Sequence, residues 1–145
     1  MSNVSEVVED PARRTAIIPD GIVELEAELD DRSGVIAMAM RAGYKALRKL
    51  RPNMVESNLD RMLPRWAPVL DPYVVAGRRD GDLTGHFETH AGEIAEGLLI
   101  VTDARAAEAN NRVSVKAYES LRPRARDQVV TGIPRLARLV DRHVP

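Results

Sequence analysis

The chain has 145 residues, enough for one ordinary domain, and its 44% hydrophobic and 30% charged residues indicate a folded globular protein rather than a disordered one. It has no cysteine, which excludes disulfides, a cysteine nucleophile and thiolate metal sites and favours a cytoplasmic location. The net charge of −1 hides an acidic stretch at residues 1–31 and an arginine-rich stretch at 121–145. These stretches are two solvated faces, neutralise each other, or form a basic surface for an anionic partner.

The first half of the chain predicts a series of helices separated by prolines. A short helix over 11–18 precedes a helix over 19–31 whose apolar residues recur at helical spacing. A third helix covers 34–50 and ends at Leu-Arg-Pro, because proline cannot donate the helical hydrogen bond. The next helix begins at about residue 53, and Pro64 either kinks it or ends it before a short helix to about residue 75.

The second half predicts the same plan. One helix covers 84–102, Asp103 caps another that ends at residue 121, and Pro123 opens the last, which Pro134 kinks or ends. Alternating strand patterns bounded by turns do not occur in the sequence. The expected fold class is therefore all-α.

Two pairs of segments repeat along the chain. KALRKLRP at 45–52 matches KAYESLRP at 116–123, and LPRWAPVLDPYV at 63–74 matches IPRLARLVDRHV at 133–144. The order and nearly constant offset predict an internal duplication, although two amphipathic helices could also agree by chance. We expect one domain over 1–145, an internally duplicated helical bundle of two three-helix repeats packed with pseudo-two-fold symmetry. Its parts are repeat 1 over about 19–75, a linker over 76–85 and repeat 2 over about 86–145.

Several short segments carry a family resemblance. They are DDRSG (30–34), AGYKALRKLRP (42–52), LDP (70–72), VTDAR (101–105) and KAYESLRP (116–123). With them the chain resembles a family of small actinobacterial proteins of unassigned function, over most of its length from about residue 15. The resemblance implies a helical fold and a bacterial cytoplasmic origin, and it implies no activity.

Only HFETH at 86–90 resembles a metal site. On one continuous helix, His86, His90 and Glu93 would share a face and could ligate a divalent ion. Histidines beside a linker are more often surface or capping residues, and we favour that interpretation. The sequence matches no catalytic motif, so we predict no catalytic residues and no cofactor, and we favour a binding role over an enzymatic one.

The repeated segments also carry cations at matching places, which are Arg41, Lys45 and Arg51 in the first copy and Arg112, Lys116 and Arg122 in the second. Cations at helix C-termini are favoured by the helix dipole and can cap carbonyls or pair with acids, which is the structural interpretation. The functional interpretation is a pair of patches for an anionic ligand. Nucleic acid is not favoured, because the net charge is low and no recognition module is present.

The segment VIAMAM at 35–40 is apolar on nearly every side, so we expect it in the core or at a subunit interface. Its helix has an apolar stripe of mostly small residues, namely Val35, Ala39, Ala42, Gly43, Ala46, Leu47 and Leu50. No apolar run approaches the length of a membrane span. We therefore expect a non-enzymatic interaction or scaffold protein whose partner is another protein or a second copy of itself, with anion binding as the main alternative.

Overall fold

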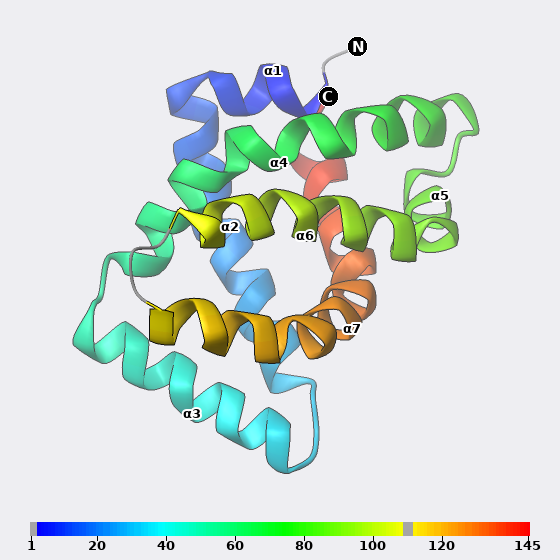
Figure 1. Ribbon diagram of the computed structural model, residues 1–145. Helices are drawn as coiled ribbons and strands as arrows, with labels where there is room; N and C mark the ends of the chain where they lie inside the picture. The colour runs from blue at the N-terminus through cyan, green and yellow to red at the C-terminus, as the bar shows by residue number, and fades with distance from the viewer. Residues whose placement is uncertain (1–2, 109–111) are drawn as a thin grey trace.

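The computed structural model describes residues 3–108 and 112–145, which form seven α-helices joined by short turns (Figure 1). No strand occurs in the described residues, so the prediction of an all-α fold is confirmed. Within the same residues, no helix has the length and apolar character needed to cross a bilayer. The helices are α1 (Val4–Glu9), α2 (Pro11–Asp30), α3 (Val35–Leu50), α4 (Met54–Arg79), α5 (Leu83–Thr89), α6 (Ala91–Ala107) and α7 (Arg112–His143).

Helices α2, α4 and α7 each contain at least one proline, and none of the three ends at it. A proline inside a helix removes one backbone hydrogen bond and crowds the preceding turn, so it bends the helix, and Figure 1 shows α7 changing direction along its length. In α4 the prolines at 64, 68 and 72 recur every four residues and therefore share one face. Pro68 and Pro72 are exposed, so the carbonyl groups that they free face water. Pro64 and Pro134 thus lie within helices and end neither.

The predicted Leu-Arg-Pro corner agrees with the structure in the first repeat and not in the second, and residues 19 and 75, the expected bounds of repeat 1, lie inside α2 and α4. The first Leu-Arg-Pro ends α3, with Arg51 as its C-cap. The second lies inside α7, so the prediction of an equivalent corner there is wrong. The single helix expected over 84–102 is divided at His90 into α5 and α6, and Asp103 lies within α6 rather than capping a new helix. The pseudo-two-fold symmetry stays a prediction.

The linker expected over 76–85 is also shorter than predicted. Helix α4 continues to Arg79 and α5 begins at Leu83, so only a turn at residues 80–82 separates them. Gly81 in this turn has φ of +73°, a left-handed conformation that glycine adopts without steric cost.

The hydrophobic core lies toward one end of the molecule, where the two described chain ends come together (Figure 1). Phe87 of α5 and Ile94 of α6 are completely buried at its centre. Around them the core collects apolar side chains from α1, α2, α4 and α7, which are Val4, Val7, Val8, Ile17, Ala67, Leu70, Val74, Ile133, Ala137, Val140 and Val144. Helix α3 contributes nothing to this core cluster, and its only buried residue is Ala37.

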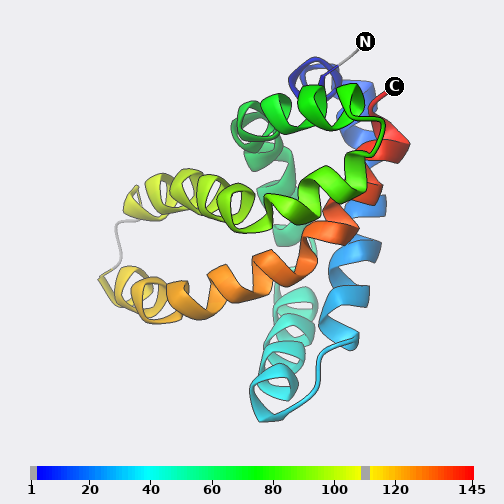
Figure 2. The same cartoon turned by 90° about the vertical axis from the view of Figure 1, so that its right-hand side faces the viewer.

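Two parts of the chain extend away from the core. Figure 2 shows α6 and the N-terminal half of α7 side by side as a helical hairpin that projects from the body. Helix α3 extends in a different direction, beside the C-terminal end of α2. Helix α3 therefore depends on contacts with its neighbouring helices, whereas α6 is also joined to the core through Ile94.

Ion pairs join the acidic N-terminal region to the basic C-terminal region. Arg135 of α7 donates to Glu28 at 2.6 Å, to Glu24 at 3.4 Å and to Asp31. Arg142 lies 3.0 Å from Glu24 on the same face of α2. Of the six arginines at 121–145, Arg135 and Arg142 thus pair with the acidic stretch, whereas Arg122 and Arg126 pair with Glu96 of α6. Mutual neutralisation therefore accounts for part of the charge asymmetry.

Candidate functional site

Helix α3 presents an apolar face to solvent. Val35 is 82% exposed and Leu50 is 79% exposed, and these two residues are the ends of the face. Small exposed residues at helical spacing lie between them, which are Ala39, Ala42, Gly43 and Ala46. Met38 and Ile36 add larger exposed side chains at its edges. Contiguous exposed apolar surface of this kind is typical of interaction sites. We call this set of eight residues the α3 face.

Polar contacts on the opposite side of α3 fix the direction in which the α3 face points. The Arg41 guanidinium donates through Nη1 to the carbonyl oxygens of Leu29, at 3.0 Å, and Arg32, at 2.6 Å, where α2 ends. Arg48 donates to Glu56 of α4 at 2.5 Å, and this hydrogen bond lowers the pKa of the Glu56 carboxyl. Because α3 is tied to both α2 and α4, the α3 face is directed outward.

The sequence predicted that VIAMAM, residues 35–40, lies in the core or at a subunit interface. Of these six residues only Ala37 is buried, so the core alternative is wrong for this chain. The interface alternative stays a prediction, and it is the one that the exposure of Val35 and Met38 supports.

The first three predicted cations lie on or beside α3 but have different surroundings. Arg41 is half-buried and is used to join α3 to α2, as described above. Lys45 and Arg51 are exposed. One of the three is thus a structural contact, and the other two are available to solvent.

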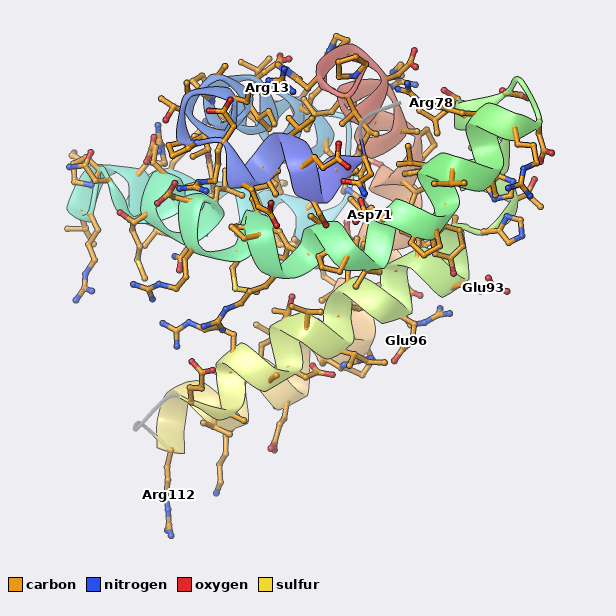
Figure 3. All side chains as sticks on the ribbon, turned by 90° about the horizontal axis from the view of Figure 1, so that it is seen from above. Arg13, Asp71, Arg78, Glu93, Glu96 and Arg112 are labelled. Carbon is orange, nitrogen blue, oxygen red and sulfur yellow. The ribbon has the colours of Figure 1, made fainter. Side chains whose placement is uncertain are left out.

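The second three predicted cations lie on α7. Arg112 and Lys116 are exposed, and Figure 3 shows Arg112 projecting from the end of the α6–α7 hairpin. Arg122 is half-buried and donates to Asp103 at 2.9 Å and to Glu96 at 2.9 Å, both on α6. These two carboxylates neutralise the charge of the Arg122 guanidinium. Arg122 therefore joins α7 to α6, as Arg41 joins α3 to α2.

A tyrosine completes the joint around Arg122. Tyr118 donates its hydroxyl to Asp103 at 2.5 Å. Burial, together with this hydrogen bond, raises the pKa of Tyr118 to about 12. Hydrogen bonds from Arg122 and then from Tyr118 lower the pKa of the Asp103 carboxyl. The sequence offered no signal for this cluster, because its members lie 15 and 19 residues apart on two helices.

The histidine segment does not form one continuous helical face. His86 lies in α5, Glu93 lies in α6, and His90 is the junction between the two helices. The His86 and His90 rings are 4.3 Å apart, and His90 Nδ1 contacts the His86 carbonyl oxygen at 2.9 Å. Glu93 accepts a hydrogen bond from the Tyr73 hydroxyl at 3.2 Å. No group of three histidine or carboxylate side chains in the described part of the chain could hold a metal ion.

A second surface feature is an apolar groove between α2, α3, α4 and α7, with a volume of about 390 Å³. Arg32 and Arg135 lie at its rim, and both are paired with Glu28. The indole N–H of Trp66 donates to Thr102 at 3.2 Å, so that the ring contributes apolar surface. The groove therefore offers hydrocarbon walls, and its charges are satisfied within the chain. Sequence periodicity could not identify it, since four separate helices form it.

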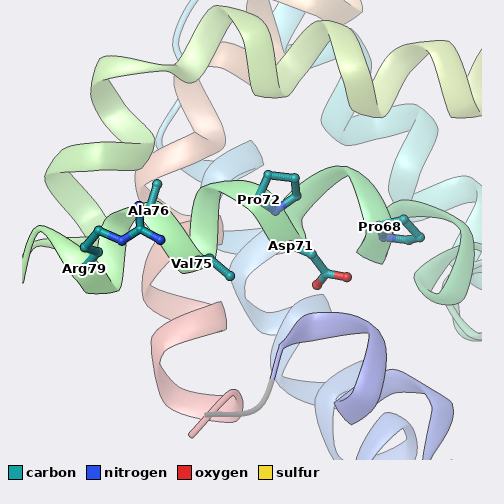
Figure 4. Close-up of a pocket in the computed structure, with 6 residues that line it drawn as sticks. All are labelled: Pro68, Asp71, Pro72, Val75, Ala76 and Arg79. Atoms are coloured by element: carbon teal, nitrogen blue, oxygen red, sulfur yellow. The ribbon is translucent and has the colours of Figure 1, made fainter.

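A shallow depression on the outer side of α4 is a further concave feature of the surface (Figure 4). Every residue that lines it comes from α4 itself, so it lacks an opposing wall. Its carboxylate, Asp71, accepts hydrogen bonds from the backbone N–H of Ser5 at 3.1 Å and from the Ser5 hydroxyl at 2.5 Å. Asp71 thus attaches α1 to α4.

Comparisons with known proteins place the chain in a family. No curated protein and no solved structure matches it. A family model described as "Family of unknown function (DUF6918)" matches residues 4–144, which includes every helix described above. Since this match covers nearly the whole sequence, the chain belongs to the family DUF6918.

Proposed function

We propose that this chain acts in the cytoplasm by protein–protein contact and that the α3 face is its contact surface. The observation that carries the proposal is the exposure of an apolar helix face whose opposite side is anchored by Arg41 and Arg48. An amphipathic helix normally turns its apolar side toward the core. Here the apolar residues point to solvent while arginines face the body, which is favourable when another chain covers the exposed side.

The alternative is a module for an anionic ligand that uses the six predicted cations. Arg41 and Arg122 already donate to groups within the chain, which supports the structural interpretation of these two residues. Lys45, Arg51, Arg112 and Lys116 are exposed and would have to carry anion binding alone. Apolar contact is therefore the better-supported function.

The test replaces one small residue at the centre of the α3 face. Ala42→Glu puts a carboxylate where a partner would exclude water, and burying an unpaired charge is strongly unfavourable. Ala104→Glu is the matched control, because Ala104 is also an exposed helical alanine but lies on α6. Affinity capture from cell extract followed by mass spectrometry should recover the same bound proteins with the wild type and with Ala104→Glu.

Those proteins should be absent from the Ala42→Glu sample. Recovery of the same partners with Ala42→Glu, in a chain whose circular dichroism is unchanged, would show that contact does not use the α3 face. Anion binding is tested in parallel on a heparin column, since retention by exposed cations decreases steeply with salt.

A further inference from the structure

Six of the eight residues of the α3 face have a symmetric order of sizes. Reading along the helix, its ends are the large residues Val35 and Leu50, and the small residues Ala39 and Ala46 come next. Ala42 and Gly43 lie at the centre. Each pair is equally far from the midpoint between residues 42 and 43. These six residues therefore have the same order of sizes in either direction, whereas Ile36 and Met38 lie at the edges of the face and outside this order.

A face with this property is complementary to a reversed copy of itself. In an antiparallel pair centred between Ala42 and Gly43, Val35 of one copy lies opposite Leu50 of the other, and Ala39 lies opposite Ala46. Such a contact is isologous, since each residue meets its counterpart through the same two-fold axis. We propose that the α3 face binds a second copy of this chain in this antiparallel arrangement. The inference rests on the proposed function and specifies its partner.

The local structure allows the close approach that this pairing needs. A Cβ added at Gly43 would meet no atom within 4 Å apart from its chain neighbours and the backbone of its own helix, so the centre of the face is unobstructed. Small residues at a helix crossing permit axes at the lower end of the usual 8–10 Å separation. Helix α3 also extends in a different direction from the α6–α7 hairpin (Figure 2).

The length of the face sets the expected strength of the pair. From Val35 to Leu50 the helix rises about 22 Å, at 1.5 Å per residue. One helix face of this length buries less area than the roughly 800 Å² per partner that stable complexes use. The expected dimer is therefore weak, with a dissociation constant in the micromolar range.

The exposed lysines give the pair a distinctive response to salt. Lys45 and Lys49 lie along one flank of the α3 face. A two-fold axis perpendicular to both helices keeps this flank on the same side in the two copies, so the lysines of both chains gather there. Screening of like charges should make the dimer tighter as salt rises. Assembly through a bound polyanion would respond in the opposite direction.

The test uses single cysteines, since the natural chain has none. In the proposed pair, residue 39 of one copy lies about 10.5 Å along the axis from residue 39 of the other, which is too far for a disulfide. Under oxidation, Ala39→Cys alone and Ala46→Cys alone should remain monomeric, whereas an equal mixture of the two should form a covalent dimer. Ala42→Cys alone should also form one, because its two copies are offset by only about 1.5 Å.

Ala104→Cys on α6 measures cross-linking by random collision and is the matched control. The experiment uses the full chain at about 100 µM, where a micromolar dimer is populated, and circular dichroism verifies that each variant is folded. Efficient linkage of Ala39→Cys to itself would overturn the antiparallel arrangement. Linkage of Ala42→Cys no faster than Ala104→Cys would overturn self-pairing altogether. If self-pairing is overturned in this way but Ala42→Glu still loses the proteins that the wild type captures, the proposed contact function stands. If self-pairing is overturned and Ala42→Glu captures the same proteins as the wild type, both the self-pairing and the contact function are contradicted.

Discussion

Arg135 shows what single residues contribute to this molecule. Its guanidinium has several donors in a planar fork, and it contacts Glu24, Glu28 and Asp31 on successive turns of α2. The side chain is only 24% exposed and that of Glu28 is 18% exposed, so water screens this pair incompletely. The acidic stripe was visible in the sequence, but its partner more than 100 residues away was not.

Replacing Arg135 should therefore lower stability more than replacing an exposed arginine. Arg135→Gln leaves Glu24 and Glu28 without this cation at the joint between α2 and α7. The matched control is Arg126→Gln, because Arg126 and its partner Glu96 are 43% and 42% exposed. Urea unfolding should show a loss of unfolding free energy about three times larger for Arg135→Gln than for Arg126→Gln. Equal losses would mean that the α2–α7 pairs are as weak as surface pairs.

Whole helices were predicted more reliably than their ends. Apolar spacing, caps and prolines predicted helix over most of residues 11–75, and the Leu-Arg-Pro stop at residue 52 is confirmed. Helix α1 was not predicted, and the separate helices expected over 11–18 and 19–31 are the single helix α2. The same triplet failed at Pro123, where Arg122 and Arg126 pair with Glu96 of α6 on both sides of the proline. These lateral contacts keep α7 continuous. A local sequence rule for proline contains no information about them.

The joint between α6 and α7 makes a prediction about pH. Tyr118 has a folded-state pKa of about 12, above its ordinary value of 10.0. The folded chain thus keeps a proton that the unfolded chain loses between these values. The resulting stabilisation is complete below about pH 10 and is lost as the pH rises through 12. Asp103→Asn removes the carboxylate that accepts the tyrosine hydrogen bond, and the pKa of Tyr118 should then fall toward 10.

Ultraviolet titration of tyrosine measures this directly in a chain with Tyr44→Phe and Tyr73→Phe, in which Tyr118 is the only tyrosine. Asp127→Asn is a suitable control, because Asp127 lies on α7 and is exposed. An unchanged titration in Asp103→Asn would mean that burial alone determines the pKa of Tyr118.

At the scale of the whole molecule, the core and the α3 face lie apart. The buried cluster joins α1, α2, α4, α5, α6 and α7, and α3 contributes no residue to it. The sequence revealed the apolar stripe of α3 because its spacing is regular, but spacing cannot show whether a stripe faces the body or solvent. The orientation of the stripe is set by Arg41 and Arg48, which bind the end of α2 and α4 through tertiary contacts. The candidate residues were therefore predictable, and their exposure was not.

This separation predicts unequal protection of the backbone against hydrogen exchange. Local opening costs least where few apolar contacts must be broken, so amides of α3 should exchange before those of α4, α5 and the C-terminal half of α7. Dimerisation through the α3 face would add contacts to α3 alone. Exchange measured by mass spectrometry at about 1 µM and about 200 µM chain should therefore slow in α3 at the higher concentration and stay constant in α5.

The Ala42→Glu variant separates this effect from nonspecific crowding at high concentration. Its α3 amides should exchange at one rate at both concentrations, because the charged centre of the face prevents pairing without altering the contacts of Arg41 and Arg48 on the opposite side. Slowing in both α3 and α5 of the wild type would instead indicate association through a surface that includes the core end of the molecule. Since α3 is tied to the body mainly by two arginines, covering its apolar side would stabilise the least protected helix of the fold. The same contact would thus complete both the interaction surface and the packing of α3.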